Sequence, residues 1–222
     1  MPKLQHKVEK DLRIPFNGFH LCGELVVPPD ASGTVLFAHG SGSSRHSPRN
    51  QFVARALHDH GLATLLFDLL TESEEREDRY SGALRFDVRL LARRLLGATH
   101  WYHSDNPDQS LGYFGSSTGG AAALIAAAQS DVPVRAIVSR GGRPDLAGAA
   151  LPKVTAPTLL IVGGEDTAVI DMNQQAYAQM LCPKELRIIP GATHLFEEPG
   201  TLEQVAQMAA EWFERHFRAS SA

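Results

Sequence analysis

The sequence has few cysteines and no long apolar run, and each absence excludes a class of protein. Cys22 and Cys182 are its two cysteines in 222 residues, so we expect neither a disulfide framework nor a cysteine-based zinc site. The longest apolar runs, such as residues 158–162, have the length of a strand and not of a membrane-spanning helix. The first residues carry charge but no apolar stretch typical of a signal peptide. We therefore expect a cytoplasmic protein that makes no contact with a membrane.

A strong excess of charge of one sign is also missing. The chain has 21 Lys and Arg against 25 Asp and Glu, a formal net charge of −4, and this composition does not indicate a nucleic-acid-binding protein. No internal repeat or low-complexity linker divides the sequence. Because 43% of the residues are hydrophobic, one domain with a substantial core is expected over residues 1–222.

Strand and helix patterns alternate along the chain. Residues 7–14 and 19–27 are predicted to pair as a hairpin. Further strands, several of them continuous apolar runs typical of buried parallel strands, are expected at 34–38, 63–68, 109–114, 134–139, 158–162 and 184–189. Helical patterns occur at 49–60, 84–98, 118–130, 170–181 and 201–217. Together they predict an α/β fold, a mostly parallel eight-stranded sheet with helices on both faces.

One stretch matches a chemical motif. Gly115-Ser116-Ser117-Thr118-Gly119 fits the pattern G-x-S-x-G, with an apolar segment before it and an Ala-rich helical segment after it. In that setting the pattern is a nucleophile elbow, which presents its central serine on a strained turn. Flanking glycines allow close backbone approach, and the following helix N-terminus favours negative charge. The alternative interpretation is a Gly/Ser-rich loop before a helix.

A serine nucleophile needs a base, normally histidine, and the base needs an acid to orient it. Asp166 follows a Gly-Gly turn after one predicted strand, and His194 follows the last predicted strand. Side chains at such positions gather at the carboxyl edge of a parallel sheet, and the order Ser, Asp, His is that of an α/β-hydrolase. Glu165 and Asp171 remain alternative acids. For Asp166, a turn or helix-capping role is the alternative.

With these motifs in this order, the sequence resembles the α/β-hydrolase superfamily, and within it the small cap-less proteins of the dienelactone hydrolase-like group. The resemblance covers about residues 8–217 and rests on residues 39–42, 115–119, 163–166 and 191–194. Dienelactone hydrolases proper carry cysteine as the nucleophile, whereas this chain has serine. The resemblance therefore implies the fold and general carboxylic-ester hydrolysis, and not dienelactone specificity.

The resemblance also implies a role for each motif. Ser117 is the implied nucleophile, His194 the base and Asp166 its orienting acid, and the backbone N–H groups of Ser41 and Thr118 would form the oxyanion hole. A histidine at the position of residue 39 mainly shapes the oxyanion turn and is not a metal ligand. No metal and no organic cofactor is implied.

The segment between residues 139 and 157 is too short for the helical cap that many relatives insert there, so we expect an open site shaped by surrounding loops. Arg45 and Arg140 fall in these loops and are candidate contacts to an acidic substrate group, although each has an ordinary surface role as its alternative. Phe196 is a candidate wall for the acyl group, with packing of its own turn as the alternative. Short acyl chains are expected, unless the acidic stretch 71–79, interpreted as a solvated loop or the start of a helix, folds over the site.

The expected activity is serine esterase activity on a small-molecule ester, with a thioesterase as the nearest alternative. Amidase or cofactor-free peroxidase chemistry on the same scaffold is a second alternative. A non-catalytic interaction protein that keeps the fold is a third, disfavoured because all three triad residue types are present. The protein is expected to be a monomer or a homodimer.

Overall fold

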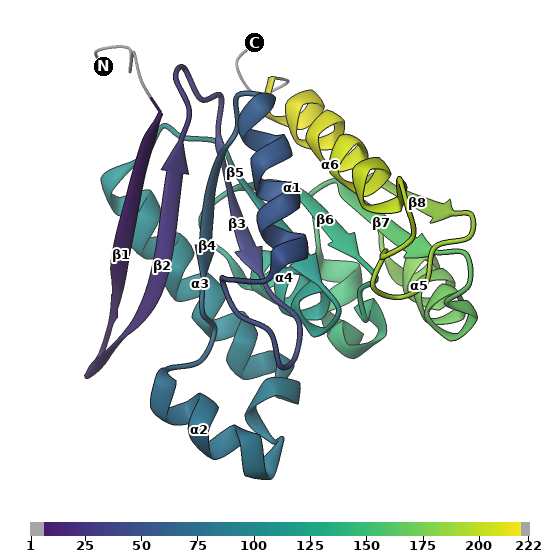
Figure 1. The fold of residues 1–222 in the computed structure, drawn as a ribbon, viewed down its shortest axis with the longest axis horizontal. Helices are drawn as coiled ribbons and strands as arrows, with labels where there is room; N and C mark the ends of the chain where they lie inside the picture. The colour runs from purple at the N-terminus through teal and green to yellow at the C-terminus, as the bar shows by residue number, and fades with distance from the viewer. Residues whose placement is uncertain (1–6, 219–222) are drawn as a thin grey trace.

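A single sheet runs through the computed structural model, which describes residues 7–218 (Figure 1). Its eight strands lie in the order β1-β2-β4-β3-β5-β6-β7-β8. The strands are β1 (Val8–Phe16), β2 (Phe19–Val27), β3 (Thr34–Ala38), β4 (Ala63–Phe67), β5 (Leu111–Ser116), β6 (Val134–Arg140), β7 (Thr158–Gly163) and β8 (Lys184–Ile189). Strand β2 pairs antiparallel with β1 and β4, and all other pairs are parallel. The predicted hairpin and mostly parallel sheet are confirmed.

Helices cover both faces of the sheet, as the alternating pattern predicts. One face packs against α1 (Pro48–Asp59) and α6 (Thr201–Arg218), and the other against α3 (Val88–Asp105), α4 (Thr118–Gln129) and α5 (Thr167–Gln179). Successive residues of a strand enter opposite cores: Leu36 packs on the α3/α4 side and Phe37 on the α1/α6 side. Strands buried on both faces explain the continuous apolar runs in the sequence.

Two segments differ from their predicted form. The acidic stretch after β4 is a complete helix, α2 (Glu72–Ser81), which projects from the body of the molecule (Figure 1). Thr71 and Glu74 close its N-terminus as a capping box. The next predicted helix is divided into a 3-10 turn, η1 (Leu84–Phe86), and the longer α3, because the Asp87 side chain accepts the N–H groups of Arg89 and Leu90 and starts a new helix there.

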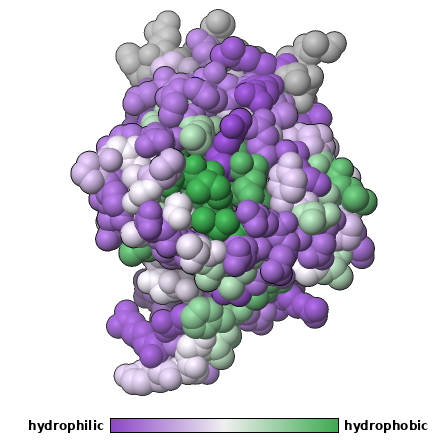
Figure 2. Space-filling view, turned by 90° about the vertical axis from the view of Figure 1, so that its right-hand side faces the viewer, coloured by the Kyte–Doolittle hydropathy of each residue, from purple (hydrophilic) through white to green (hydrophobic). Residues whose placement is uncertain are grey.

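The segment between β6 and β7 holds only the 3-10 segment η2 (Pro144–Lys153), so no helical cap is inserted there. Within residues 7–218, no helix is both long and apolar enough to cross a membrane. Seen from the side of β8, the surface is mainly hydrophilic, with a hydrophobic area near the centre and another at the right edge (Figure 2). Large exposed apolar side chains include Leu181, which is 79% exposed just before β8, and Ile188 within it. Strand β8 ends the sheet, so no neighbouring strand covers this side.

Candidate active site

Ser117 lies on the turn between β5 and α4, with φ +51° and ψ −121°. A positive φ is strained for any residue other than glycine and marks functional turns. Two glycines make this turn possible. A Cβ on Gly119 would lie 2.0 Å from the Ala38 carbonyl oxygen, and one on Gly115 would lie 2.5 Å from the Gly119 carbonyl oxygen. The geometry is that of the predicted nucleophile elbow.

The structure brings His194 and Asp166 together. His194 Nδ1 lies 2.6 Å from Asp166 Oδ2. An ionised carboxylate only accepts hydrogen bonds, so Nδ1 carries the proton and Nε2 is left as the acceptor, the state a general base requires. The His194 side chain is 41% exposed and that of Asp166 16%. Of the three candidate acids weighed from the sequence, Asp166 is the one placed against the histidine.

Backbone hydrogen bonds hold the two turns that carry these residues. Gly164 N–H donates to the Ile189 carbonyl at 2.8 Å, and Glu165 N–H donates to the Ala192 carbonyl at 3.0 Å. The turn after β7 and the turn after β8 therefore form one unit, which fixes the position of the acid relative to the base.

His194 reaches the residue that follows β6, close to Ser117. His194 Cε1 lies 3.6 Å from the position of a Cβ built on Gly141. The preceding residue, Arg140, accepts the Ser117 N–H at its carbonyl oxygen (3.2 Å). Within residues 7–218, Ser117 Oγ makes no hydrogen bond to His194. Such contacts are commonly loose in a free enzyme and shorten when substrate binds.

The predicted oxyanion donors belong to two segments next to Ser117. Gly40 lies against the nucleophile, because a Cβ built on it would be 3.1 Å from Ser117 Cβ, and Ser41 follows it. Thr118 is the first residue of α4, where a helix N–H has no partner in its own helix. Neither the Ser41 N–H nor the Thr118 N–H has a hydrogen-bond acceptor in the described part of the chain. Both are available to a developing negative charge.

His39 supports this loop from inside. Its Nε2 accepts the Leu69 N–H at 3.0 Å, so its Nδ1 carries the proton and donates to the Gly40 carbonyl oxygen at 2.9 Å. Burial lowers the pKa of His39 and keeps the ring neutral. Both ring nitrogens are engaged in backbone contacts, which agrees with the predicted shaping role.

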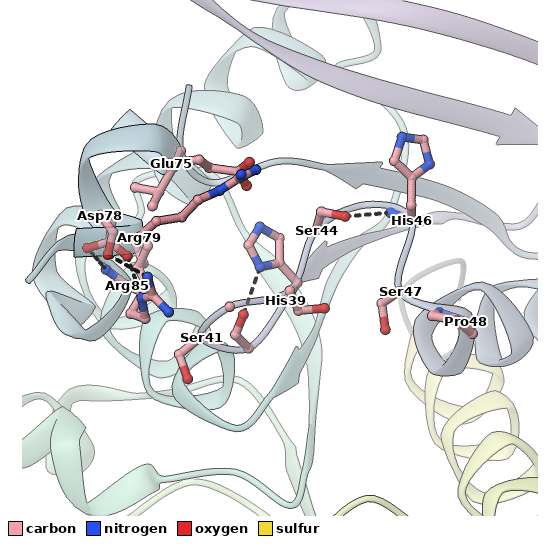
Figure 3. A pocket seen from close by; sticks show the side chains of 15 residues that line it. His39, Ser41, Ser44, His46, Ser47, Pro48, Glu75, Asp78, Arg79 and Arg85 are labelled. Atoms are coloured by element: carbon pink, nitrogen blue, oxygen red, sulfur yellow. Dashed lines mark hydrogen bonds and ion pairs between the residues drawn. The ribbon is translucent and has the colours of Figure 1, made fainter. Parts of the chain in front are cut away.

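A pocket of about 420 Å³ opens beside the oxyanion loop. Helix α2 and η1 form its opposite wall, from which Glu75, Arg79 and Arg85 line it (Figure 3). Leu70 and Leu91 are the large aliphatic side chains of its lining. The acidic stretch is expected from the sequence near the site as a solvated loop or the start of a helix, and in the structure it is the complete helix α2 that forms this wall. The signal was present in the Thr71-x-x-Glu74 spacing of a capping box.

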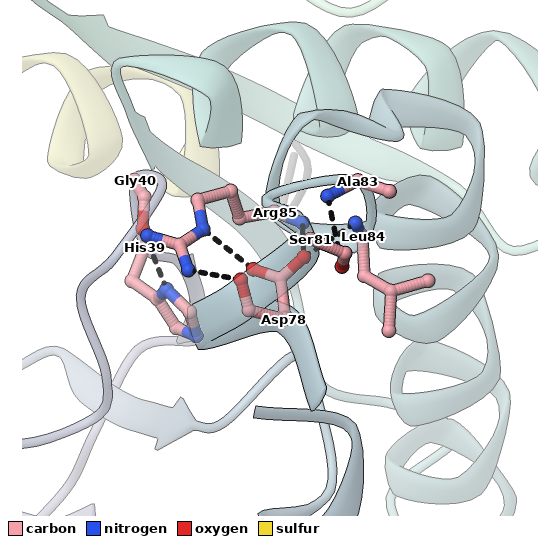
Figure 4. A network of polar contacts seen from close by, with 7 residues as sticks. All are labelled: His39, Gly40, Asp78, Ser81, Ala83, Leu84 and Arg85. Atoms are coloured by element: carbon pink, nitrogen blue, oxygen red, sulfur yellow. Dashed lines mark hydrogen bonds and ion pairs between the residues drawn. The ribbon is translucent and has the colours of Figure 1, made fainter. Parts of the chain in front are cut away.

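Asp78 anchors α2 to η1 (Figure 4). One of its carboxylate oxygens accepts Arg85 Nε at 2.5 Å and the other accepts the Leu84 N–H at 2.6 Å. The Asp78 side chain is only 3% exposed. The two elements of the pocket wall are therefore tied to each other by charge-assisted hydrogen bonds.

The three candidate substrate contacts differ in their surroundings. Arg45 forms an ion pair with Asp68, which also accepts the Arg45 backbone N–H at 2.8 Å. Phe196 is only 2% exposed, with φ +55°, and packs inside its turn. Arg140 is 7% exposed at the end of β6.

No group of three or more His, Cys, Asp or Glu side chains suited to a metal ion occurs among residues 7–218.

Comparison with known proteins identifies the family and agrees with the fold. The family model described as Dienelactone hydrolase family matches residues 24–219. The crystal structure of a dienelactone hydrolase from Anabaena variabilis is 56% identical, with a TM-score of 0.93, and the match covers 96% of this chain and 99% of that one. Est1E from Butyrivibrio proteoclasticus is 18% identical with a TM-score of 0.73 over 94% of this chain and 99% of that one, and shares the fold.

A Mycobacterium tuberculosis protein named "Putative phosphoribosyl transferase" (strain H37Rv) is 54% identical over 210 residues. The match covers 94% of this chain but 46% of that protein, so the chain spans about half the length of this relative. The fold, the elbow and the family model all lead to one assignment. The chain belongs to the dienelactone hydrolase family.

Proposed function

We propose that this hydrolase is a serine esterase that cleaves small carboxylic esters. The observation that carries the proposal is the 2.6 Å contact between His194 Nδ1 and Asp166 Oδ2, on turns next to a serine held at φ +51°. The contact leaves His194 Nε2 as a proton acceptor, and the His194 ring lies near Gly141, the residue after the one whose carbonyl accepts the Ser117 N–H.

The reaction proceeds through an acyl-enzyme. Ser117 Oγ attacks the ester carbonyl carbon while His194 Nε2 takes the hydroxyl proton, and the Ser41 and Thr118 N–H groups stabilise the oxyanion. His194 then gives its proton to the leaving alkoxide, which departs as the alcohol. Water, deprotonated by His194, attacks the acyl-enzyme and the carboxylic acid is released, while His194 returns the proton to Ser117 Oγ.

The phosphoribosyl transferase name belongs to a relative about twice as long as the matched segment. Serine in place of the cysteine of dienelactone hydrolases proper supports general ester hydrolysis. The lining of the pocket supports short acyl chains, because Leu70 and Leu91 offer little apolar surface to a long one. Each methylene left in water forgoes roughly 0.8 kcal/mol of binding.

A panel of p-nitrophenyl esters from acetate to palmitate, with a matched thioester and anilide, tests the proposal. We expect the highest kcat/KM for acyl chains of about two to six carbons and a loss of at least about a thousandfold in Ser117→Ala. Ser116→Ala is the matched control and should retain activity. Substantial turnover by pure Ser117→Ala would remove that residue from the mechanism. A preference for the thioester would favour the thioesterase alternative, and an optimum at twelve carbons or longer would contradict the short-chain assignment.

A further inference from the structure

Arg140 occupies an unusual position for a charged residue. It is the last residue of the central strand β6, in register with Ser116 of β5 and Ile161 of β7. Its carbonyl oxygen accepts the N–H of Ser117. Ala136 and Val138, on the same face of β6, pack in the α1/α6 core, so the Arg140 side chain projects to that side of the nucleophile.

Among residues 7–218, no acidic side chain pairs with the guanidinium of Arg140. The residue is 7% exposed, and its Nε and Nη1 are buried without a hydrogen-bond acceptor in the described part of the chain. Arg94 is equally buried, at 8% exposed, but pairs with Glu74 at 2.6 Å. Desolvating an unpaired charge is costly, so buried arginines normally have an acid beside them. Arg140 has no such acid beside it in the described part of the chain.

A second arginine, Arg49, lies near Arg140. Arg49, in the first turn of α1, pairs with Glu197 at 3.0 Å. The neighbouring Phe196 ring has its centre 5.9 Å from Arg140 Cζ and also lies 3.5 Å from the position of a Cβ on Gly141. Burial, and then the charge of Arg49, lower the pKa of Arg140 to about 10, so it stays protonated at neutral pH. Glu197 is exposed and already paired with Arg49. The positive charge of Arg140 is therefore not balanced by this acid.

We propose that Arg140, with Arg49 beside it, binds an anionic group of the substrate next to Ser117. This inference rests on the proposed esterase function and narrows it to esters that carry a carboxylate or a phosphate-like group. Both anions match the planar donor fork of a guanidinium. Nη2 makes no hydrogen bond in the described part of the chain and is not among the atoms buried without a partner, so the anion would approach the guanidinium from that side. The contact would hold the ester beside the nucleophile and lower the barrier by orientation.

Paired substrates that differ only in charge test this assignment. The p-nitrophenyl esters of butyric, succinic and 3-phosphonopropionic acid have acyl groups of similar length, the last two with a terminal anion, and are compared at constant ionic strength. Spontaneous hydrolysis is subtracted with Ser117→Ala. We expect wild type to favour at least one anionic ester over butyrate in kcat/KM, and the larger of the two ratios identifies carboxylate or phosphonate as the better ligand.

The ratio of anionic to neutral kcat/KM is the decisive quantity, because it cancels changes in the amount of folded enzyme. We expect Arg140→Met to lower this ratio about tenfold or more, Arg140→Lys to lower it less, and Arg49→Gln to lower it partly. Arg143→Met is the matched control. Arg143 is already paired with Asp145 by two hydrogen bonds of 2.9 and 2.8 Å, so its loss should leave the ratio as in wild type.

A binding measurement separates failure of this inference from failure of the esterase proposal. Succinate and inorganic phosphate are titrated into Ser117→Ala, with and without Arg140→Lys, and Tm is followed. An anion-dependent rise in Tm that needs Arg140 supports the anion site even if no ester is cleaved. No rise, together with an unchanged substrate ratio in both Arg140→Lys and Arg49→Gln, would overturn the assignment. Neither outcome depends on Arg140→Met folding.

Discussion

Gly163 and Ala192 approach each other more closely than any side chain at position 163 would allow. A Cβ on Gly163 would lie 2.3 Å from the Ala192 carbonyl oxygen and 2.6 Å from that of Thr193. Both contacts are to backbone, which cannot move aside as a flexible side chain can. This approach joins the end of β7, three residues before Asp166, to the turn that carries His194.

We therefore predict that Gly163→Ala separates the acid from the base and lowers kcat/KM on p-nitrophenyl butyrate by about 10- to 100-fold. Gly97→Ala is the control, because its Cβ would lie 2.4 Å from the Phe16 ring, far along the sheet from the site. That variant should lose thermal stability but keep the kcat/KM of its folded fraction. Wild-type activity in Gly163→Ala would show that the two turns are not coupled in this way.

Asp166 and Asp171 provide a direct comparison of acids. Asp166→Asn keeps the shape of the side chain but removes the charge that stabilises the imidazolium, so kcat should fall by about 10²- to 10⁴-fold. Asp171 lies exposed on α5, and Asp171→Asn should leave kcat unchanged. Steady-state kinetics on one ester are sufficient. Because triad members act as a unit, Asp166→Asn combined with His194→Ala should be little worse than His194→Ala alone, and additive losses would contradict a shared role.

His39 is predicted to act on catalysis through the oxyanion loop. His39→Leu leaves the Leu69 N–H and the Gly40 carbonyl without their partners, at a stability cost of about 1–3 kcal/mol for each buried group left unpaired. Displacement of Ser41 should lower kcat more than it raises KM. His39→Gln, which can restore one of the two contacts, should recover part of the loss in kcat. Equal kcat in both variants and wild type would mean that the loop holds its shape without this residue.

His58 makes stability depend on pH. Burial, and then the charge of Lys7, lower its pKa from 6.5 to about 4, and its Nε2 contacts Thr64 Oγ1 at 2.7 Å. Between these two pH values the unfolded chain binds a proton at His58 that the folded protein does not, so the free energy of unfolding should fall as the pH is lowered from 6.5 toward 4. The His58 side chain is only partly buried, so the effect is modest.

Urea unfolding midpoints at pH 4.5, 5.5, 6.5 and 7.5 measure this dependence. In His58→Gln the slope below pH 6.5 should be shallower, because glutamine can keep a contact to Thr64 without titrating. The slope should not vanish, since burial also lowers the pKa of His39. His20→Gln, at an exposed position on β2, is the control. Identical slopes in wild type and His58→Gln would contradict the assignment.

Much of the fold could be predicted because burial leaves a clear pattern in the sequence. Strands such as β3 and β7 are covered on both faces, so their apolar runs are continuous and end at the turns that carry function. The placement of Asp166 against His194 also follows from strand order, since the turns after β7 and β8 are neighbours in a parallel sheet. Helix α2 is harder to predict, because its many charged residues hide the helical period. The capping signal at Thr71 is the feature that indicates this helix.

The surroundings of Arg140 could not be predicted in the same way. The sequence places this residue at the end of a strand. It does not reveal on which face the side chain lies or which acids are near it. The other arginines of the site loops also look alike in sequence, yet Arg45 has Asp68 and Arg143 has Asp145 as partners. Whether a charge is neutralised depends on contacts between distant segments, which local patterns do not contain.

Covalent labelling of the elbow serine tests the central claim most directly. The intact protein is treated with a fluorophosphonate, digested, and the modified peptide is located by mass spectrometry. We predict one adduct per chain on Ser117, formed at a rate that falls sharply in His194→Ala and absent from Ser117→Ala, with ester hydrolysis lost in proportion to labelling. An adduct on another residue, or full ester hydrolysis after Ser117 is completely modified, would contradict the account.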